Sequence, residues 1–151
     1  MADRTLWTAA IPGGNVLTHG SNVFNLKAGA AITRGMVVSV HGTGIDWTVH
    51  PAVLGTTLCP IGIATETVAS GAMCPIAGIG CIAYGQQETN DTDQDAGTRV
   101  VQTDSAGMFG AEAGTAPDEY LVGILLEASD ASALTYERVL VLCGLPTQTH
   151  A

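Results

Sequence analysis

Short runs in which apolar and polar residues alternate at every second position cover most of this chain. Side chains of a β-strand point alternately to its two faces, so this period predicts strands. Glycine-rich and polar segments separate the runs at spacings near ten residues, as in a β-sandwich or small barrel. No stretch repeats apolar residues at helical spacing over three turns, and at most one helical turn is expected, at Pro51–Thr57. The predicted strands are Asn15–Thr18, Asn22–Leu26, Met36–His41, Ile45–Val49, Ile61–Glu66, Ala72–Ala77, Ile79–Tyr84, Thr98–Thr103, Tyr120–Ala128 and Tyr136–Cys143.

Residues 73–85, MCPIAGIGCIAYG, form an apolar run that glycines interrupt. On a period of two, Cys74 and Cys81 face opposite sides of one strand, so they cannot share a ligand. Glycine removes a side chain where a strand bends sharply or another backbone approaches. Pro75 fits only a sheet edge or a bulge. We therefore predict one long strand or two short strands, bent at Gly78 around a tight barrel corner.

Three segments share a turn pattern, in which a small or polar pair leads into a glycine and a β run follows. They are AITRGMVVSV at 31–40, TVASGAMCPI at 67–76 and DQDAGTRVVQT at 93–103. Each glycine is predicted to supply the positive φ of a turn before a strand begins.

The two ends of the chain differ from its middle. Residues 1–24 are apolar but broken by glycine and proline, and we predict an extended N-terminal arm that can add a strand to a neighbouring protein. A β-domain is predicted at 25–145 and a flexible tail at 146–151. The candidate side chains of the arm for binding a partner are Leu6, Trp7, Ile11, Val16 and Leu17.

Composition adds a prediction of assembly. The 151 residues fit one domain, and only 13% of them are charged, against about 25% in ordinary soluble domains. Because charge keeps a small protein soluble as a monomer, this scarcity predicts an oligomer or an assembly component. The net charge is −9 and Lys27 is the only lysine, which disfavours binding to nucleic acid or to anionic lipid. Neither a signal peptide nor a transmembrane helix is predicted.

No constellation of reactive side chains stands out. The four cysteines form no CxxC pair and have no zinc spacing, so buried free thiols are expected, although a disulfide stays open. No G-x-S-x-G, phosphate-binding or dinucleotide motif is present, and HGTG at 41–44 fits a turn. Neither an enzymatic site nor a cofactor is predicted.

An acidic segment, ETNDTDQDAG at 88–97, resembles the beginning of a calcium loop. Its candidate ligands are Asp91, Asp93 and Asp95. Ala96 stands where such a loop needs glycine, and Gln102 stands where it needs a bidentate acid. A solvated hairpin loop is therefore the favoured interpretation, and calcium binding is the weaker one.

The two tryptophans are candidates for contact with partners. Tryptophan either fills a core or anchors an interface. Trp7, in the predicted arm, is assigned to an interface. Trp47 is assigned to the core or to a subunit contact, and both remain open.

Four segments together resemble the capsid-decoration, or head-stabilising, proteins of tailed bacteriophages. The resemblance covers roughly 26–143 and rests on short glycine-based motifs: A-x-I-x-x-G-x-V-V, I-G-I-A followed by A-S-G, G-x-R-V followed by D-x-x-G, and V-G-I-L-L-E-A-S. The segments are LKAGAAITRGMVVSV, PIGIATETVASGAMCPIAGIGCIAYG, DAGTRVVQTDSAGMF and YLVGILLEASDA with ERVLVLC.

The resemblance implies a small β-barrel or β-tulip-like fold that forms a homotrimer. Such trimers sit on the outer surface of an icosahedral head and clamp neighbouring major capsid subunits, and their N-terminal arm commonly pairs with capsid strands. It implies a protein made in the host cytoplasm and carried on the virion, with no nucleic acid or membrane as partner. The alternative is a non-enzymatic β-sandwich binding module, adhesin-like or calcium-dependent.

Overall fold

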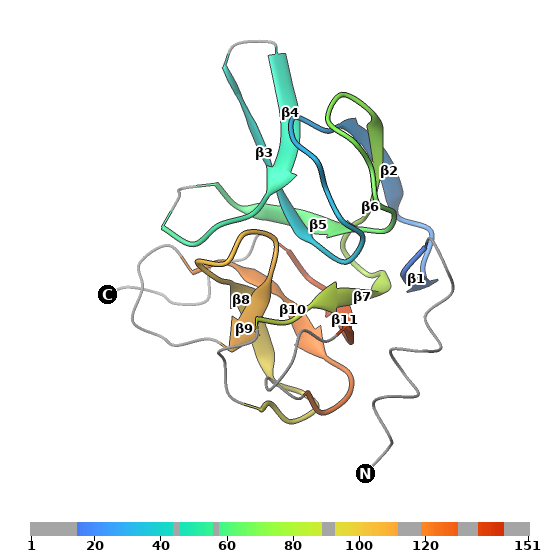
Figure 1. Cartoon of the computed structure of the whole chain (residues 1–151). Coiled ribbons are helices and arrows are strands. Elements are labelled where there is room, and N and C mark those ends of the chain that lie inside the picture. Colours follow the sequence, from blue (N-terminus) through green and yellow to red (C-terminus); the bar gives the residue numbers. More distant parts are fainter. Residues whose placement is uncertain are drawn as a thin grey trace.

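The computed structural model contains strands and turns and no helix in the residues that it describes (Figure 1). This confirms the predicted all-β class. The described residues are 15–43, 46–55, 58–88, 93–111, 119–129 and 136–143.

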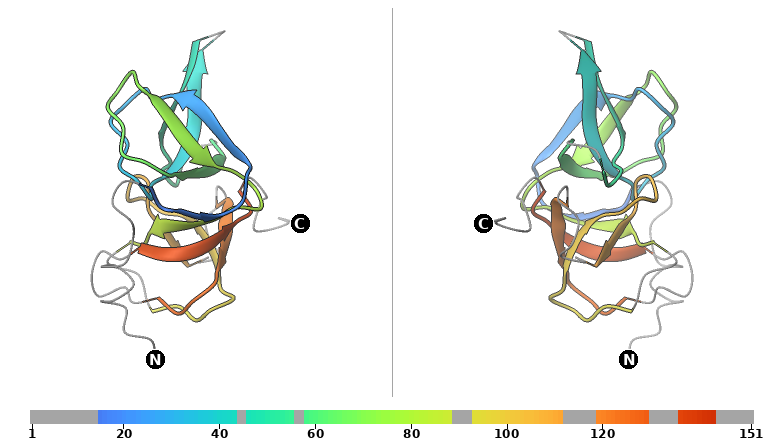
Figure 2. Two further views of the ribbon diagram at one scale, coloured as in Figure 1. Left: turned by 90° about the vertical axis from the view of Figure 1, so that its right-hand side faces the viewer. Right: turned by 90° about the vertical axis from the view of Figure 1, so that its left-hand side faces the viewer.

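Two antiparallel sheets, stacked one above the other, make up the molecule (Figures 1 and 2). Sheet A has six strands in the order β1 (Leu17–His19), β7 (Ile82–Gln86), β11 (Tyr136–Val141), β10 (Leu121–Leu125), β8 (Arg99–Gln102) and β9 (Phe109–Ala111). Sheet B has five strands in the order β2 (Val23–Lys27), β6 (Met73–Ala77), β5 (Pro60–Ala64), β3 (Val37–Thr43) and β4 (Asp46–Pro51).

After β1 the chain completes sheet B before it builds the rest of sheet A. The change of sheet falls at residues 78–81, between β6 and β7. Gly80 has a φ of 89°, and a Cβ on Gly78 would lie 2.8 Å from Nδ2 of Asn22. The alternative of two short strands is therefore the one observed, and the bend is a crossing between sheets instead of a barrel corner.

Neither sheet closes into the predicted barrel. In sheet B the edge strands β2 and β4 approach at one isolated parallel bridge, Ala28 to Val49. In sheet A, Gln87, just after the inner strand β7, forms a second isolated bridge with Phe109 of the edge strand β9. A continuous ladder does not form among the described residues because β9 has only three residues and β2 ends at Lys27, just before the bridge.

Two hydrophobic clusters stabilise this arrangement. The first lies between the sheets, and the second lies inside the curl of sheet B. Successive residues alternate between them: Val37 belongs to the first and Val38 to the second, as do Ala77 and Ile76. Sheet B is thus buried on both faces, which explains its nearly continuous apolar runs. The first cluster includes Val37, Ile63, Ala77, Cys81, Val100, Phe109, Val122, Leu125 and Val139; the second is Ala28, Ile32, Val38, Val49, Ala64, Cys74 and Ile76.

The predicted strands all overlap observed ones, and the three predicted turn glycines, Gly35, Gly71 and Gly97, have positive φ of 84°, 88° and 92°. Strand β9 was not predicted, because a run of three residues has no measurable period. The predicted helical turn is not observed among its described residues; Pro51 ends β4 and a turn follows at Leu54.

Several glycines of the phage-like motifs lie where a side chain does not fit, although Gly71 and Gly97 have open space around them. A Cβ on Gly35 would lie 2.6 Å from the ring of Tyr136, and one on Gly123 would lie 2.1 Å from the carbonyl oxygen of Leu140. Real Cβ atoms do not approach neighbours this closely. The motifs therefore report requirements of the fold, and evidence on function must come from the surface.

Candidate interaction surface

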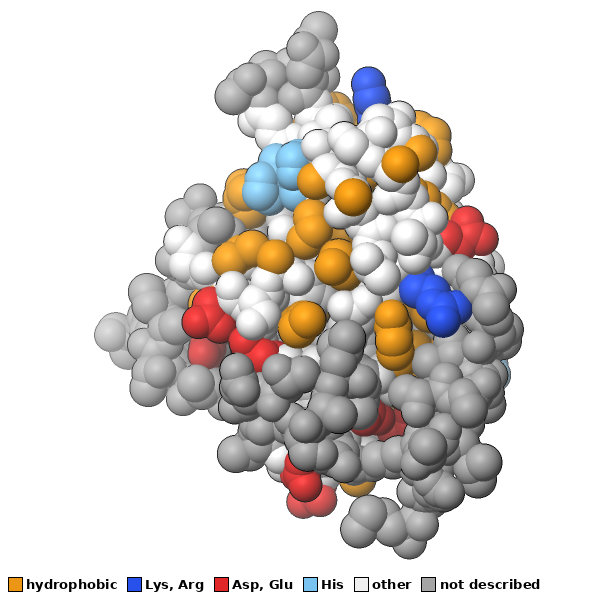
Figure 3. Space-filling model, in the orientation of Figure 1, with side chains coloured by type: hydrophobic (Ala, Val, Ile, Leu, Met, Phe, Trp, Pro, Cys, Tyr) orange, Lys and Arg blue, Asp and Glu red, His pale blue; other side chains and the backbone are white. Residues whose placement is uncertain are grey.

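Charge is divided unequally between the two sheets. Residues 15–77, which contain β1 and all of sheet B, carry two acidic and two basic residues, whereas 78–143, which contain the other strands of sheet A and their connections, carry eleven acidic and two basic residues. In the face shown in Figure 3, most of the visible acidic side chains lie over the lower part of the molecule, and hydrophobic side chains gather over the upper part. The sheet B end is therefore neutral. The excess of acidic residues belongs to the other half of the sequence, where it falls in the segments that join the strands of sheet A, since those strands include one acidic residue, Glu137.

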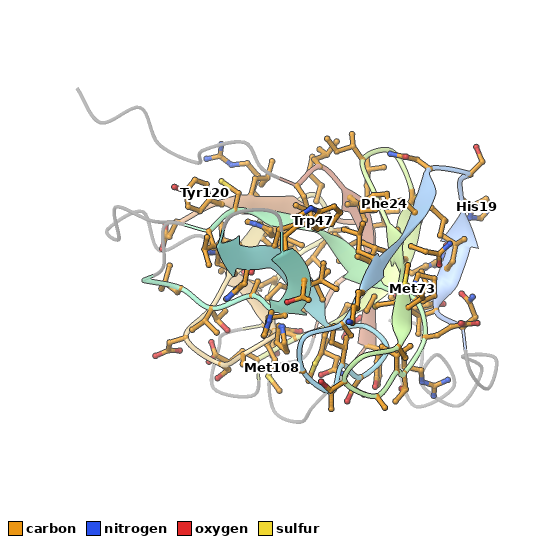
Figure 4. The ribbon with its side chains drawn as sticks, turned by 90° about the horizontal axis from the view of Figure 1, so that it is seen from above. His19, Phe24, Trp47, Met73, Met108 and Tyr120 are labelled. Carbon is orange, nitrogen blue, oxygen red and sulfur yellow. The ribbon has the colours of Figure 1, made fainter. Side chains whose placement is uncertain are left out.

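The neutral end carries a set of apolar side chains that we name the apolar rim, defined as Phe24, Leu26, Val40 and Trp47. The first three are partly buried against the cluster inside sheet B. Trp47 lies on the same face of β4 as buried Val49, and its neighbour on β3 is Gly42, which has no side chain to cover it. Trp47 is consequently 50% exposed. Figure 4 shows Trp47 and Phe24 together at this end of the molecule.

Trp47 is thus outside the core, so of its two predicted locations, core or subunit contact, the first is wrong. Exposure of half of a tryptophan leaves a large apolar surface in water, and such residues commonly anchor interfaces. The subunit contact stays a prediction.

Other exposed apolar side chains do not join the rim. Met73 is 56% exposed but lies on the opposite face of sheet B, because its neighbours in the period of two point toward sheet A. Ile79 is 57% exposed in the crossing between the sheets, and Leu126 is 41% exposed after β10. Single exposed side chains of this kind are ordinary.

The other face of the β3–β4 hairpin holds two histidines. The rings of His41 and His50 stack with centroids 4.5 Å apart. Nε2 of His41 is 3.0 Å from the Ser39 hydroxyl, and Nε2 of His50 is 3.0 Å from the Thr48 hydroxyl. Burial, and secondarily the neighbouring His50, lower the pKa of His41 below 6.5. The hairpin therefore favours the neutral form of the His41 imidazole.

The predicted arm lies partly outside the described residues, which do not include Leu6, Trp7 or Ile11. Val16 is 1% exposed and packs with Tyr84 and Tyr136, and its amide donates a hydrogen bond to Thr65. Leu17 begins β1 and is half-buried against the cluster between the sheets. In this conformation Val16 is therefore unavailable to a partner, because this chain's own fold covers it.

All four cysteines are free, as expected. Cys74, Cys81 and Cys143 are buried, and Cys59 is half-buried. Burial raises the pKa of Cys74 to about 11, with a smaller contribution from Glu66, and burial raises the pKa of Cys143 to about 12. Such thiols are poor nucleophiles and poor metal ligands at neutral pH.

Sheet A contains a pocket of about 230 Å³ that the sequence did not indicate. Its polar lining includes Glu88, Gln102 and Glu119. Ser105 donates a hydrogen bond to Glu88, and the side-chain oxygen of buried Gln102 has no hydrogen-bond partner among the described residues. The alternation of apolar and polar residues cannot reveal a buried glutamine, because a polar residue in a strand is assigned to the solvent-facing side.

Metal ligands are not brought together in the part of the chain that the structure describes. No group of three His, Cys, Asp or Glu side chains suited to a metal ion exists within the described ranges. Asp91 lies outside those ranges, and Asp93 and Asp95 are exposed. The calcium interpretation gains nothing from this part of the chain.

Comparisons with other proteins leave the family undecided. No helix in the described part of the chain is long and apolar enough to cross a bilayer. No protein-family model matches the chain, and no curated protein sequence does. The resemblance to phage decoration proteins therefore rests on the sequence motifs.

Proposed function

We propose that this protein is a structural capsid-decoration protein of a tailed bacteriophage. It binds the outside of the icosahedral head as a trimer, clamps neighbouring major capsid subunits and stabilises the shell without catalysis. Its β-tulip-like body and its N-terminal arm act together in this binding.

The unequal division of charge is the observation that carries the proposal. A body with one neutral, apolar end and one acidic end can press the first against protein and turn the second toward solvent. Like charge on the exposed ends keeps decorated particles apart, as net charge does for soluble proteins. The resemblance of the sequence motifs to those of phage decoration proteins adds support.

Clamping would work through several linked contacts. A standard interface buries ~800 Å² on each partner. At ~25 cal/mol per Å² this corresponds to a gross gain of ~20 kcal/mol, most of which association costs offset. Three such contacts in one trimer bind at high effective concentration, so the shell cannot release a subunit without breaking all of them.

The direct test mixes the purified chain with expanded capsids of its phage and images the particles. Added density at three-fold and quasi-three-fold positions is expected, and bare capsids would refute the proposal. Deletion of residues 1–14 should abolish attachment and leave thermal unfolding of the isolated protein nearly unchanged. Attachment by the deleted protein would exclude the arm.

Calcium separates this proposal from a calcium-dependent binding module. A ligand that binds only the native state raises the melting temperature by mass action. We expect no shift on adding calcium chloride, with magnesium chloride as the control. A large shift that calcium alone produces would favour the binding module.

A further inference from the structure

The β3–β4 hairpin exposes one side of its backbone next to the apolar rim. Among the described residues β4 pairs with β3 along one edge, and its other edge is joined to the chain only at Val49, whose carbonyl accepts a hydrogen bond of 2.9 Å from Gly29. Alternate residues of a strand direct their backbone groups to the same edge. The N–H and C=O of Trp47 therefore point to the same outer edge as the carbonyl of Val49.

This edge is physically accessible. In Figures 1 and 2 the hairpin rises beyond the other strands of sheet B. Unpaired strand edges readily bind other chains unless charge or proline protects them. The strand β4 reads Asp-Trp-Thr-Val-His-Pro, so a charged residue and a proline stand at its two ends. Between them, at 47–50, neither protection is present, and a half-exposed tryptophan and open backbone groups coincide at one place.

Charge identifies which partner suits this surface. Two copies of a chain with a net charge of −9 repel each other if they meet through sheet A. A partner with a basic surface would be attracted to sheet A and not to the neutral end. The neutral end has no such excess of acidic residues, so identical copies can approach through it without this repulsion, and every copy carries the same apolar rim.

We propose that the apolar rim, with the outer edge of β4, is the contact between copies of this chain. Trp47 is its anchor and becomes buried against a sister copy. This inference rests on the proposed function and deepens it: the apolar rim and the edge of β4 make the contact between copies, and the rest of the neutral end and the arm are left for the shell.

The test is self-association of the isolated full-length chain, measured by sedimentation over a wide concentration range. Wild type should associate, and W47D should raise the dissociation constant by about 30-fold or more, as expected for loss of an interface anchor. L126D is the matched control, because Leu126 is 41% exposed on sheet A, and it should associate like wild type. Equal association of W47D and wild type, or a strictly monomeric wild type, would overturn the inference.

Fluorescence distinguishes the contact from a folding defect. The chain has two tryptophans, so W7F leaves Trp47 as the single reporter. Its emission should shift to the blue as concentration rises, because burial removes water from the indole. Association without a change in emission would place the contact elsewhere.

Salt and capsid binding complete the design. Raising sodium chloride from about 0.05 M to about 0.5 M screens the acidic halves, so association should persist or strengthen; strong weakening would overturn an apolar contact. Capsid binding is scored separately. If W47D stays monomeric and wild type does not attach to capsids, the proposed function fails while the contact stands.

Discussion

The two sheets are built from similar short strands, but the halves of the molecule around them differ in charge and in which side chains they bury. Sheet B is almost without charge and has apolar clusters on both faces, one of them shared with sheet A. The half that contains sheet A carries the excess of acidic residues, in the segments that join its strands, and buries Gln86 and Gln102 within strands. A small chain with few charges can thus place most of its charged residues in one half, where they favour solubility, and leave the other half suited to protein contact.

The largest expected loss of stability comes from replacing glycines at which neighbouring strands approach closely. Such changes test whether this close approach is equally strict in both sheets. In G123A of sheet A the new Cβ would lie 2.1 Å from the Leu140 carbonyl oxygen, and in G62A of sheet B it would lie 2.3 Å from that of Ala77. Backbone atoms cannot yield without breaking a ladder, so each change should cost at least ~3 kcal/mol or prevent folding.

Urea unfolding checks this prediction, with G55A as the control. Gly55 has a positive φ of 83° but open space around it, so G55A should cost only about 1 kcal/mol. If G62A were as mild as G55A, sheet B would tolerate a rearrangement that sheet A does not, and the two sheets would differ in rigidity.

The next effect separates the two clusters. Ile63 is fully buried between the sheets, and Ile76 is fully buried inside sheet B. I63A and I76A should each cost about 3 kcal/mol, because each leaves a cavity. Hydrogen exchange should rise in both sheets for I63A and mainly in sheet B for I76A. Equal rises in sheet A would show that the clusters act as one cooperative unit.

A smaller effect should appear at alkaline pH in both halves, since Cys74 belongs to sheet B and Cys143 follows β11. The folded pKa values, about 11 and about 12, lie above the ordinary value of 9.0. The unfolded thiols lose their protons first, so stability falls as pH rises above 9.0 toward about 11. Burial raises the pKa of Tyr84 too and acts in the same direction.

Unfolding free energies measured between neutral and alkaline pH check the thiol prediction. The C74A and C143A variants should each reduce the slope, and C59A, at a half-buried position, serves as the control. A slope that both variants retain would assign the alkaline response to other groups.

The smallest effect concerns the histidine pair of sheet B. The pKa of His41 is lowered by burial and by His50, so the unfolded chain binds the proton more readily. Stability should therefore fall slightly as pH decreases from about 7 to about 5. Melting temperature against pH should be flatter in H41Q than in wild type, whereas H19Q, on exposed β1 of sheet A, should keep the wild-type slope. An unchanged slope in H41Q would contradict the role of the pair.

Local features of this fold were predictable because they depend on neighbouring residues only. Alternation located the longer strands, and the pattern before Gly35, Gly71 and Gly97 located turns whose positive φ only glycine adopts easily. Strand β9 was missed because it is short, although Phe109 within it is among the largest fully buried side chains.

The candidate surface was predictable only in part. Trp47 stood out as a scarce aromatic residue, but its alternatives, core or contact, have the same sequence signature. Exposure depends on Gly42 across the hairpin and on how far the hairpin rises beyond sheet B. Val16 looked like part of a free arm, and Tyr84 and Tyr136, distant in sequence, bury it.

The sequence alone determined that this chain forms short strands with glycine turns and few charges, because backbone preference and alternation are local. The sequence also contains more acidic residues after residue 78 than before it. This difference becomes a difference between two halves of the molecule only because the crossing at residues 78–81 separates the strands into two sheets. Tertiary structure decided which strands are neighbours, that neither sheet closes, and which apolar side chains remain exposed. These outcomes depend on packing between residues far apart in the chain, which no local pattern records.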